Sequence, residues 1–226
     1  MQTIHGTTRA NDGDWSADLT TESRIIELVA TRGGVSPKTA VWTQLTHGTG
    51  HYVVGPDDHG LLGRGDALLT TEPGVTLAIR TADCVPVFVT GDHTAALLHA
   101  GMAGAAQGIL PHLVSTLMAE HSEQATDLSV ELGPHICASC YEVSPGNAMY
   151  LKGFPDATRF IRESDGKRTF DLSAQLADQV ERLGITDFTP ASACTHHDHG
   201  YFSARGDAGS QRVLSYLMIA PESGNA

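Results

Sequence analysis

Long apolar runs, basic residues and cysteines are all scarce in this 226-residue chain. No stretch approaches the ~20 consecutive apolar residues of a membrane-spanning helix, which argues against a membrane protein of that class. Lys and Arg number 14 against 26 Asp and Glu, so the formal net charge is -12. This acidity works against nucleic acid or an anionic membrane as a main partner. An anionic substrate would therefore need a local cluster of arginines.

The chain has four cysteines, and its first residues show no basic segment followed by an apolar one. The sequence therefore predicts no secretory signal, and it favours reduced thiols in a cytoplasmic protein. Cys137 and Cys140 form a single Cys-x-x-Cys motif between Pro134 and Tyr141-Glu142-Val143. Without a second such motif, and in a pattern typical of a turn into a strand, they are interpreted as buried structural thiols.

The chain shows no linker, internal repeat or low-complexity tract, so residues 1–226 are expected to form one domain. The predicted fold class is α+β, a sandwich-like mixed α/β domain with several mixed sheets flanked by helices, and a monomer is favoured. Residues 56–65 are interpreted as a polar loop, and the first residues as a turn-rich segment. The patterns predict helices over residues 20–30, 109–120 and 172–183, and strands over residues 39–46, 51–54, 66–70, 75–79, 94–98, 127–132 and 212–219.

Three residues that commonly bind metals follow short apolar runs. Cys84 follows the run that starts at Val75, His99 follows Leu98, and His47 comes after the run ending at Leu45. Thiolate and imidazole bind borderline-soft metals, and three protein ligands with an open fourth position are the catalytic zinc arrangement. We therefore expect His47, Cys84 and His99 to bind one metal.

The motifs together resemble a known family. They are Gln44 with His47-Gly48, Asp66-Ala67, Thr81-Ala82-Asp83-Cys84-Val85-Pro86, His99-Ala100-Gly101, Gly133-Pro134, Cys140-Tyr141-Glu142-Val143, Asp171-Leu172, Cys194-Thr195 and Phe202-Ser203. In this order and spacing, the chain from about residue 40 onward resembles the laccase-domain family. Its members were formerly called polyphenol oxidases and later understood as purine nucleoside phosphorylases with adenosine deaminase side activity. The most specific signal is ADCVP followed by HAG, 15 residues after its cysteine.

The resemblance implies a zinc cofactor, with copper less favoured, and a purine nucleoside and phosphate as substrates. It implies catalytic roles for His47 and Cys84, with Asp83 as the first choice for the acid. Gln44 is expected to orient the purine.

The family's tryptophan and arginine after HAG are replaced here by Met102 and Ala103. Phosphate is therefore expected to be held by the metal and by Arg205 or Arg212.

Three other functions remain open from the residues alone. The first is a copper-dependent oxidase of phenols, and the second is a metal-free cysteine hydrolase with Cys84 as nucleophile and His99 as base. The third is a nucleoside-binding protein with reduced turnover. The polar run containing His196, His197 and His199 resembles a metal cluster, but it is interpreted as a solvated loop at the mouth of the site.

Overall fold

The computed structural model describes residues 1–164 and 166–221. The helices in these ranges are α1 (Glu22–Gly33), α2 (Met102–Ala106), α3 (Ile109–Glu120), α4 (Pro145–Leu151), α5 (Pro155–Thr158) and α6 (Leu172–Arg182). The strands are β1 (Thr3–Thr7), β2 (Thr39–Gln44), β3 (His51–Val54), β4 (Gly60–Arg64), β5 (Ala67–Thr70), β6 (Val75–Thr81), β7 (Val85–Thr90), β8 (Ala95–Ala100), β9 (Ser129–Leu132), β10 (Ile161–Ser164), β11 (Lys167–Phe170), β12 (Asp187–Thr189) and β13 (Val213–Ile219).

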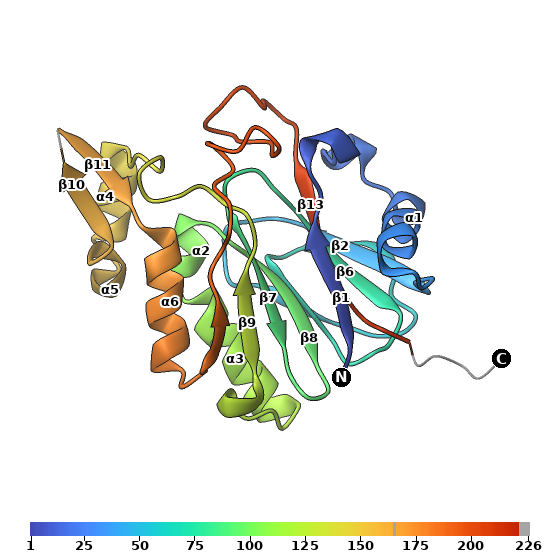
Figure 1. The fold of residues 1–226 in the computed structure, drawn as a ribbon. Helices are drawn as coiled ribbons and strands as arrows, with labels where there is room; N and C mark the ends of the chain where they lie inside the picture. The colour runs from blue at the N-terminus through green and yellow to red at the C-terminus, as the bar shows by residue number, and fades with distance from the viewer. Residues whose placement is uncertain (165, 222–226) are drawn as a thin grey trace.

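Two sheets pack face to face in the middle of the molecule (Figure 1). The five-stranded sheet has the order β1-β13-β6-β2-β4, and the six-stranded sheet has the order β12-β9-β7-β8-β5-β3. Each contains parallel and antiparallel pairs. Buried apolar side chains from both sheets form the core between them, including Val41, Leu77 and Leu217 from one and Leu68 and Leu97 from the other. The predicted sandwich-like mixed fold is confirmed.

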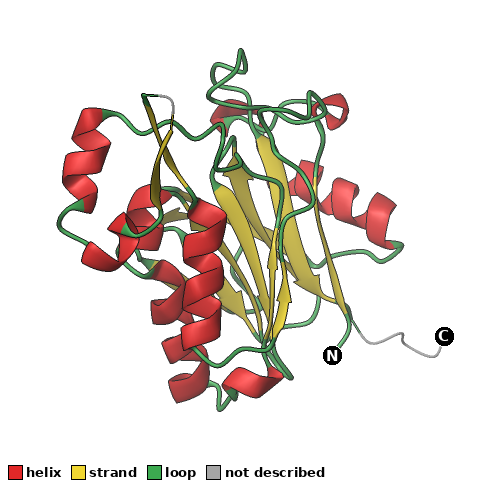
Figure 2. Cartoon of the chain, turned by 60° about the vertical axis from the view of Figure 1, so that its left-hand side comes forward, coloured by secondary structure: helices red, strands yellow, loops and turns green. Residues whose placement is uncertain are grey.

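Helices cover the outer face of each sheet (Figure 2). Helix α1 buries Ile25 and Val29 against the five-stranded sheet. Helices α3 and α6 bury apolar side chains such as Leu113 and Leu176 against the six-stranded sheet. The two-stranded sheet β10-β11 lies at one edge with α4 and α5 (Figure 1). No helix in the described part of the chain is long and apolar enough to span a membrane.

Local signals place the main helices where the sequence predicted them. The hydroxyl of Thr21 accepts the N–H of Arg24 at the start of α1, and Gly34 ends this helix with φ +69°. The carboxylate of Asp171 caps α6 by accepting the N–H of Ala174. Side-chain acceptors at the first turn and glycine after the last turn are ordinary helix boundaries, which is why they can be read from sequence.

In two segments the structure has a strand where the sequence predicted a loop or turns. Residues 60–64 form the edge strand β4 within the stretch predicted to be a polar loop. Residues 3–7 form β1, which pairs antiparallel with β13. The partner of β1 lies about two hundred residues away, so nothing near it in the sequence signals the pairing.

Candidate metal centre

His47, Cys84 and His99 come together as the sequence predicted. Their ligand atoms all lie within 4.8 Å of one another. The two imidazole rings are perpendicular, with their centroids 4.8 Å apart. His99 is only 2% exposed and Cys84 is half-buried, whereas His47 is exposed. The three donors therefore line a site that opens to solvent on the His47 side.

Strand alternation explains why Cys84 and His99 meet. Leu97 of β8 and Phe88 of β7 both face the core between the two sheets. Side chains two residues apart point to the same face of a strand. His99, two residues after Leu97, therefore faces this core, and so does Cys84, four residues before Phe88. In the pairing of β7 with β8, His99 lies opposite Pro86. The two ligands therefore lie together at one end of the space between the sheets.

His47 reaches the site from the other sheet. It follows β2 in the segment that crosses to β3, and its backbone has φ +60°, in the left-handed region that a residue with a Cβ seldom adopts. The amide of Gln107 on the turn after α2 contacts the carbonyl oxygen of His47 at 3.4 Å. A Cβ on Gly104 would lie 3.0 Å from the carbonyl oxygen of Gly48, so α2 packs closely on this segment.

Asp66 holds this arrangement together, and it is fully buried. Its carboxylate accepts the backbone N–H groups of Thr46 (3.0 Å), His47 (2.9 Å) and Gly48 (2.9 Å), and also the Thr46 hydroxyl. His99 Nδ1 lies 2.9 Å from Asp66 Oδ1. An ionised carboxylate can only accept, so Nδ1 is the donor and Nε2 remains for the metal side.

The pKa of Asp66 is strongly perturbed. Burial acts to raise it, but His99, Thr46 and the backbone donors outweigh burial and hold it far below its usual range. Asp66 belongs to the motifs that carry the family resemblance, but nothing near it in the sequence indicates this role. Its signal lies in the pairing of β5 with β8, which places Asp66 beside His99, and this pairing is a tertiary feature.

The thiol and imidazole at the site also perturb each other. Burial acts to raise the pKa of Cys84, but the neighbouring His99 and His47 outweigh it and lower this pKa to about 6. Burial acts to lower the pKa of His99, but Cys84 and Asp66 outweigh it and raise this pKa to about 9. Near neutral pH, Cys84 is therefore mainly the thiolate, the form that binds metal.

The space at the site suits a metal ion. Gly101 precedes α2, and a Cβ there would lie 3.0 Å from His47 Cδ2 and 3.2 Å from Cys84 Sγ. The donor set is one thiolate and two imidazoles, one of them oriented by a carboxylate. This set fits zinc or copper in its chemistry.

A cationic pocket lies next to His47. It has a volume of about 400 Å³, and Gln44, His47, Arg80 and Arg212 are among its lining residues. Burial and the nearby Arg212 together lower the pKa of Arg80, while Asp18 partly offsets them. Among the described residues, neither arginine has an ion-pair partner within 4 Å. The structure thus places Gln44 and Arg212 on one pocket and adds Arg80, which no sequence motif indicated.

Asp83 and Arg205 lie together on another wall of the site. Asp83 Oδ1 accepts the Thr195 hydroxyl (2.7 Å), and Asp83 Oδ2 accepts the backbone N–H of Arg205 (2.8 Å). The Arg205 guanidinium donates to the carbonyl of Glu142 (2.9 Å) and lies 5.1 Å from the centroid of the Tyr141 ring. Burial, and then the charge of the nearby Cys84, raise the pKa of Tyr141 to about 12.

Comparison with known proteins identifies the family. The family model described as multi-copper polyphenol oxidoreductase laccase matches residues 10–220. The chain belongs to this laccase family. Among its relatives, a purine nucleoside phosphorylase of Streptomyces coelicolor is 34% identical over 196 residues, which are 85% of this chain and 80% of that protein. A purine nucleoside phosphorylase of Aquifex aeolicus is 30% identical, over 69% of this chain and 71% of that protein.

Solved structures share the fold of this chain. YlmD from Geobacillus stearothermophilus superposes with a TM-score of 0.84 at 23% identity, over 97% of this chain and 92% of that one. The Bacillus licheniformis protein YfiH superposes with a TM-score of 0.83 at 23% identity, over 96% and 93%. The resemblance inferred from the sequence motifs is confirmed.

A second group of metal-binding side chains occurs in this laccase-family chain. Cys137, Cys140, Cys194 and His197 place one donor atom each within 4.8 Å of one another. This is a candidate site with three thiols and one imidazole. The Cys-x-x-Cys thiols are not buried as predicted, because both cysteines are partly exposed, and they share a cluster with Cys194 and His197. His197 is exposed, as expected for a solvated loop, but its ring also contacts the sulfur of Cys140.

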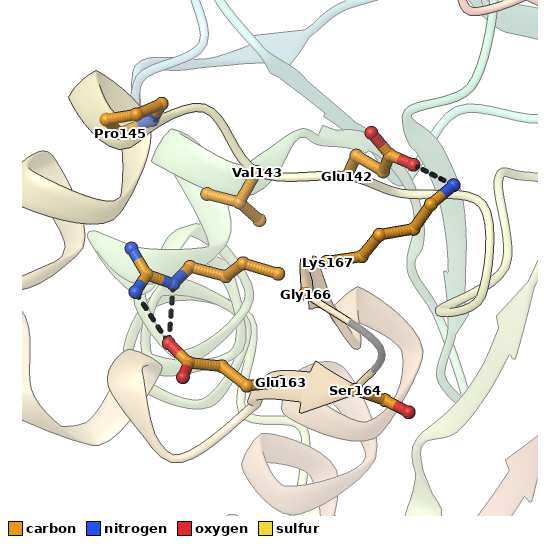
Figure 3. Close-up of a pocket in the computed structure, with 8 residues that line it drawn as sticks. Glu142, Val143, Pro145, Glu163, Ser164, Gly166 and Lys167 are labelled. Atoms are coloured by element: carbon orange, nitrogen blue, oxygen red, sulfur yellow. Dashed lines mark hydrogen bonds and ion pairs between the residues drawn. The ribbon is translucent and has the colours of Figure 1, made fainter.

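A separate hollow of about 560 Å³ lies beside the hairpin β10-β11 (Figure 3). Glu142 pairs with Lys167 at 2.7 Å, and Glu163 pairs with Arg168 at 2.6 Å. These charges on its lining are already matched, in contrast to the arginine pair beside His47.

Proposed function

We propose that the chain is a purine nucleoside phosphorylase, which splits adenosine or inosine with phosphate into the free base and ribose 1-phosphate. The observation that carries this proposal is a candidate metal triad beside two arginines, Arg80 and Arg212, that have no ion-pair partner within 4 Å among the described residues. Relatives named purine nucleoside phosphorylase support it. Cys84, His47 and His99 supply the metal donors, and Arg80 and Arg212 supply the cations that a phosphate dianion requires.

Zinc is the proposed metal. When bound, it supplies a Lewis-acidic position where an oxygen of phosphate or substrate is polarised. The chain's own contribution is to hold Cys84 as a thiolate and to fix the ring of His99 through Asp66. Loss of the Cys84 thiolate or of the Asp66–His99 contact is expected to weaken binding of the metal.

Phosphate is proposed to bind between Arg80 and Arg212. The two guanidinium groups repel each other, and the carboxylate of Asp18 offsets this repulsion only in part, so a bound dianion would relieve the rest. Gln44 lines the same pocket, where its amide can donate to phosphate or orient the nucleoside. The Arg212 guanidinium also donates to the carbonyls of Gly209 (3.1 Å) and Gln211 (2.8 Å), which hold it in place at the pocket. Arg205 does not line this pocket, and its guanidinium donates to the carbonyl of Glu142, so we assign it to the wall of the site.

Both carboxylate oxygens of Asp83 accept hydrogen bonds, one from the Thr195 hydroxyl and one from the N–H of Arg205. We therefore propose that Asp83 positions the turn that carries Cys84, and that it does not serve as the acid. The pKa of Tyr141 is raised to about 12, so its hydroxyl stays protonated near neutral pH, and it lies near Cys84. We propose that this hydroxyl donates a proton to the leaving base.

Deamination of adenosine is the proposed side reaction. It needs water in place of phosphate, so it requires the metal donors and not the arginine pair. Inosine formed from adenosine in phosphate-free buffer would identify it.

The test is product analysis by zinc-loaded protein with inosine or adenosine, with and without phosphate. Arg80→Met and Arg212→Met are each expected to raise the KM for phosphate about 10- to 150-fold, because each removes a charge-assisted contact of about 1.5–3 kcal/mol. Arg168→Met is the matched control, since its guanidinium pairs with Glu163 at the hairpin.

Absence of ribose 1-phosphate under all these conditions would refute phosphorolysis. An unchanged phosphate KM in both variants, with a raised KM in Arg205→Met, would move the anion site to Arg205. Oxidation of phenols by copper-loaded protein would favour the oxidase alternative. Activity that survives complete chelation would favour Cys84 as a nucleophile.

A further inference from the structure

The second thiol and imidazole cluster is built from separate parts of the chain. Cys137 and Cys140 belong to one turn, in which the N–H groups of Cys140 and Tyr141 donate to the carbonyl of Cys137 (3.0 and 3.1 Å). Cys194 and His197 come from the long segment before β13. An isolated bridge between His135 and Cys194 holds the two segments side by side.

The donor atoms already point at one another. His197 Nε2 lies 2.9 Å from the sulfur of Cys140, and the N–H of Cys137 donates to the sulfur of Cys194 (3.2 Å). Sulfur ligands about 2.3 Å from a tetrahedral zinc are separated by about 3.8 Å, so a group confined within 4.8 Å needs only small shifts to enclose an ion. The four cysteines of the chain are all free, so no disulfide competes for these sulfurs.

The composition of the cluster indicates its occupant. Two cysteines separated by two residues, plus a third cysteine and a histidine, match the closed Cys₃His set of structural zinc sites. With four protein donors, this set leaves no open position for a substrate. The triad at Cys84, by contrast, has three donors and is open on one side.

The cluster is connected to the candidate active site through neighbouring residues. Thr195 follows Cys194, and its hydroxyl donates to Asp83, the residue before Cys84. Further along the same segment, the N–H of Arg205 donates to the other oxygen of Asp83. Fixing Cys194 to the Cys137–Cys140 turn therefore also fixes the segment that holds Asp83.

We propose that Cys137, Cys140, Cys194 and His197 bind a structural zinc ion that fastens residues 194–205 over the candidate active site. This second zinc is independent of the proposed phosphorolysis, because none of its ligands belongs to the His47–Cys84–His99 triad. Its role is to hold the wall of the site, and it takes no part in the reaction.

Zinc stoichiometry tests the proposal. Elemental analysis of the protein purified under reducing conditions is expected to give two zinc ions per chain. Cys140→Ser is expected to lose the zinc of the second cluster and keep the zinc of the His47–Cys84–His99 triad. The double variant Cys84→Ser/His99→Ala is expected to lose the zinc of the triad and keep the zinc of the second cluster. If the double variant holds no zinc although the wild type holds zinc, the second site does not exist.

His197→Ala keeps the test usable if Cys140→Ser fails to fold, because His197 is exposed. It is expected to release the second zinc to a colorimetric chelator at least ten times faster than the wild type. His199→Ala is the matched control, since His199 lies in the same segment but outside the cluster. Equal release rates from His197→Ala, His199→Ala and wild type would overturn the proposal.

Hydrogen exchange tests the fastening role without relying on activity. In Cys140→Ser, amides of residues 194–205 are expected to exchange faster than in the wild type, while amides of β6 and β8 keep their protection. Unchanged exchange over residues 194–205 after loss of the second zinc would overturn the proposed role. A Cys137–Cys140 disulfide in freshly isolated protein, seen by thiol titration, would overturn the zinc assignment.

Discussion

Replacing Asp66 by asparagine is the sharpest test of how the candidate active site is held. Asparagine has the same shape but offers only one acceptor oxygen in place of two. In the wild type, Asp66 Oδ1 contacts His47 and His99, and Asp66 Oδ2 accepts the N–H of Gly48 at 2.9 Å. If the asparagine oxygen takes the place of Oδ1, its NH₂ group takes the place of Oδ2 and faces the N–H of Gly48. A buried donor without an acceptor costs about 1–3 kcal/mol, and the surviving hydrogen bonds lose the benefit of the charge.

The sum is a loss of about 3 kcal/mol in the free energy of unfolding. For a chain of this size, it corresponds to a Tm lower by about 6–12 °C. Zinc affinity at the triad should fall about 10- to 100-fold, because Asp66 orients His99. Thermal unfolding and zinc competition with a chromophoric chelator measure the two effects.

The control for Asp66→Asn is Asp92→Asn, the same chemical change at an exposed side chain. It should leave both Tm and zinc affinity unchanged. The sign of the pH dependence follows from the lowered pKa of Asp66. Its stabilisation is present above the unfolded pKa of about 3.9 and is lost as pH falls through the lower folded value. A variant within about 0.5 kcal/mol of wild type at neutral pH would refute the reasoning, since surface changes lie in that range.

Two further predictions concern titrating groups. In metal-free protein the Cys84 thiolate should appear as pH rises through about 6, and in His99→Gln the pKa of Cys84 should move up towards its ordinary value. Ultraviolet thiolate absorbance, corrected with Cys84→Ala, measures both pKa values. A wild-type transition near 8.5 would contradict the prediction. Burial acts to raise the pKa of Glu123, but the N–H groups of His93 and Asp92 and the Thr94 hydroxyl outweigh it and lower this pKa. Its stabilisation is therefore present above about pH 4.3 and lost as pH falls through the folded value, so urea unfolding should show a weaker acid dependence in Glu123→Gln than in wild type.

The sequence was sufficient for features that depend on near neighbours. Helix α1 could be read from Thr21 and Gly34, because a cap and a left-handed glycine act within one turn. Strands β6 and β8 could be read as continuous apolar runs, because both of their faces are buried. The residues Cys84 and His99 could be predicted as ligands, because each lies at or near the end of such a strand.

Strand β1 shows the first limit of the sequence. Its five residues are only partly buried or exposed, and their pairing with β13 depends on a partner at the other end of the chain. Strand β4 is similar, since it is an edge strand flanked by polar residues. Short-range patterns cannot predict such pairings, because the stabilising hydrogen bonds are made to distant segments.

The sequence by itself determined the fold class, the family and the choice of His47, Cys84 and His99 as candidate ligands, because periodicity and motif spacing are properties of neighbouring residues. Only the tertiary structure decided the role of Asp66, which depends on the pairing of β5 with β8. Only the tertiary structure also placed Arg80 beside Arg212, and Cys194 and His197 beside the Cys-x-x-Cys turn. Each of these groups combines residues far apart in the chain, and their chemistry arises from distances that folding alone fixes.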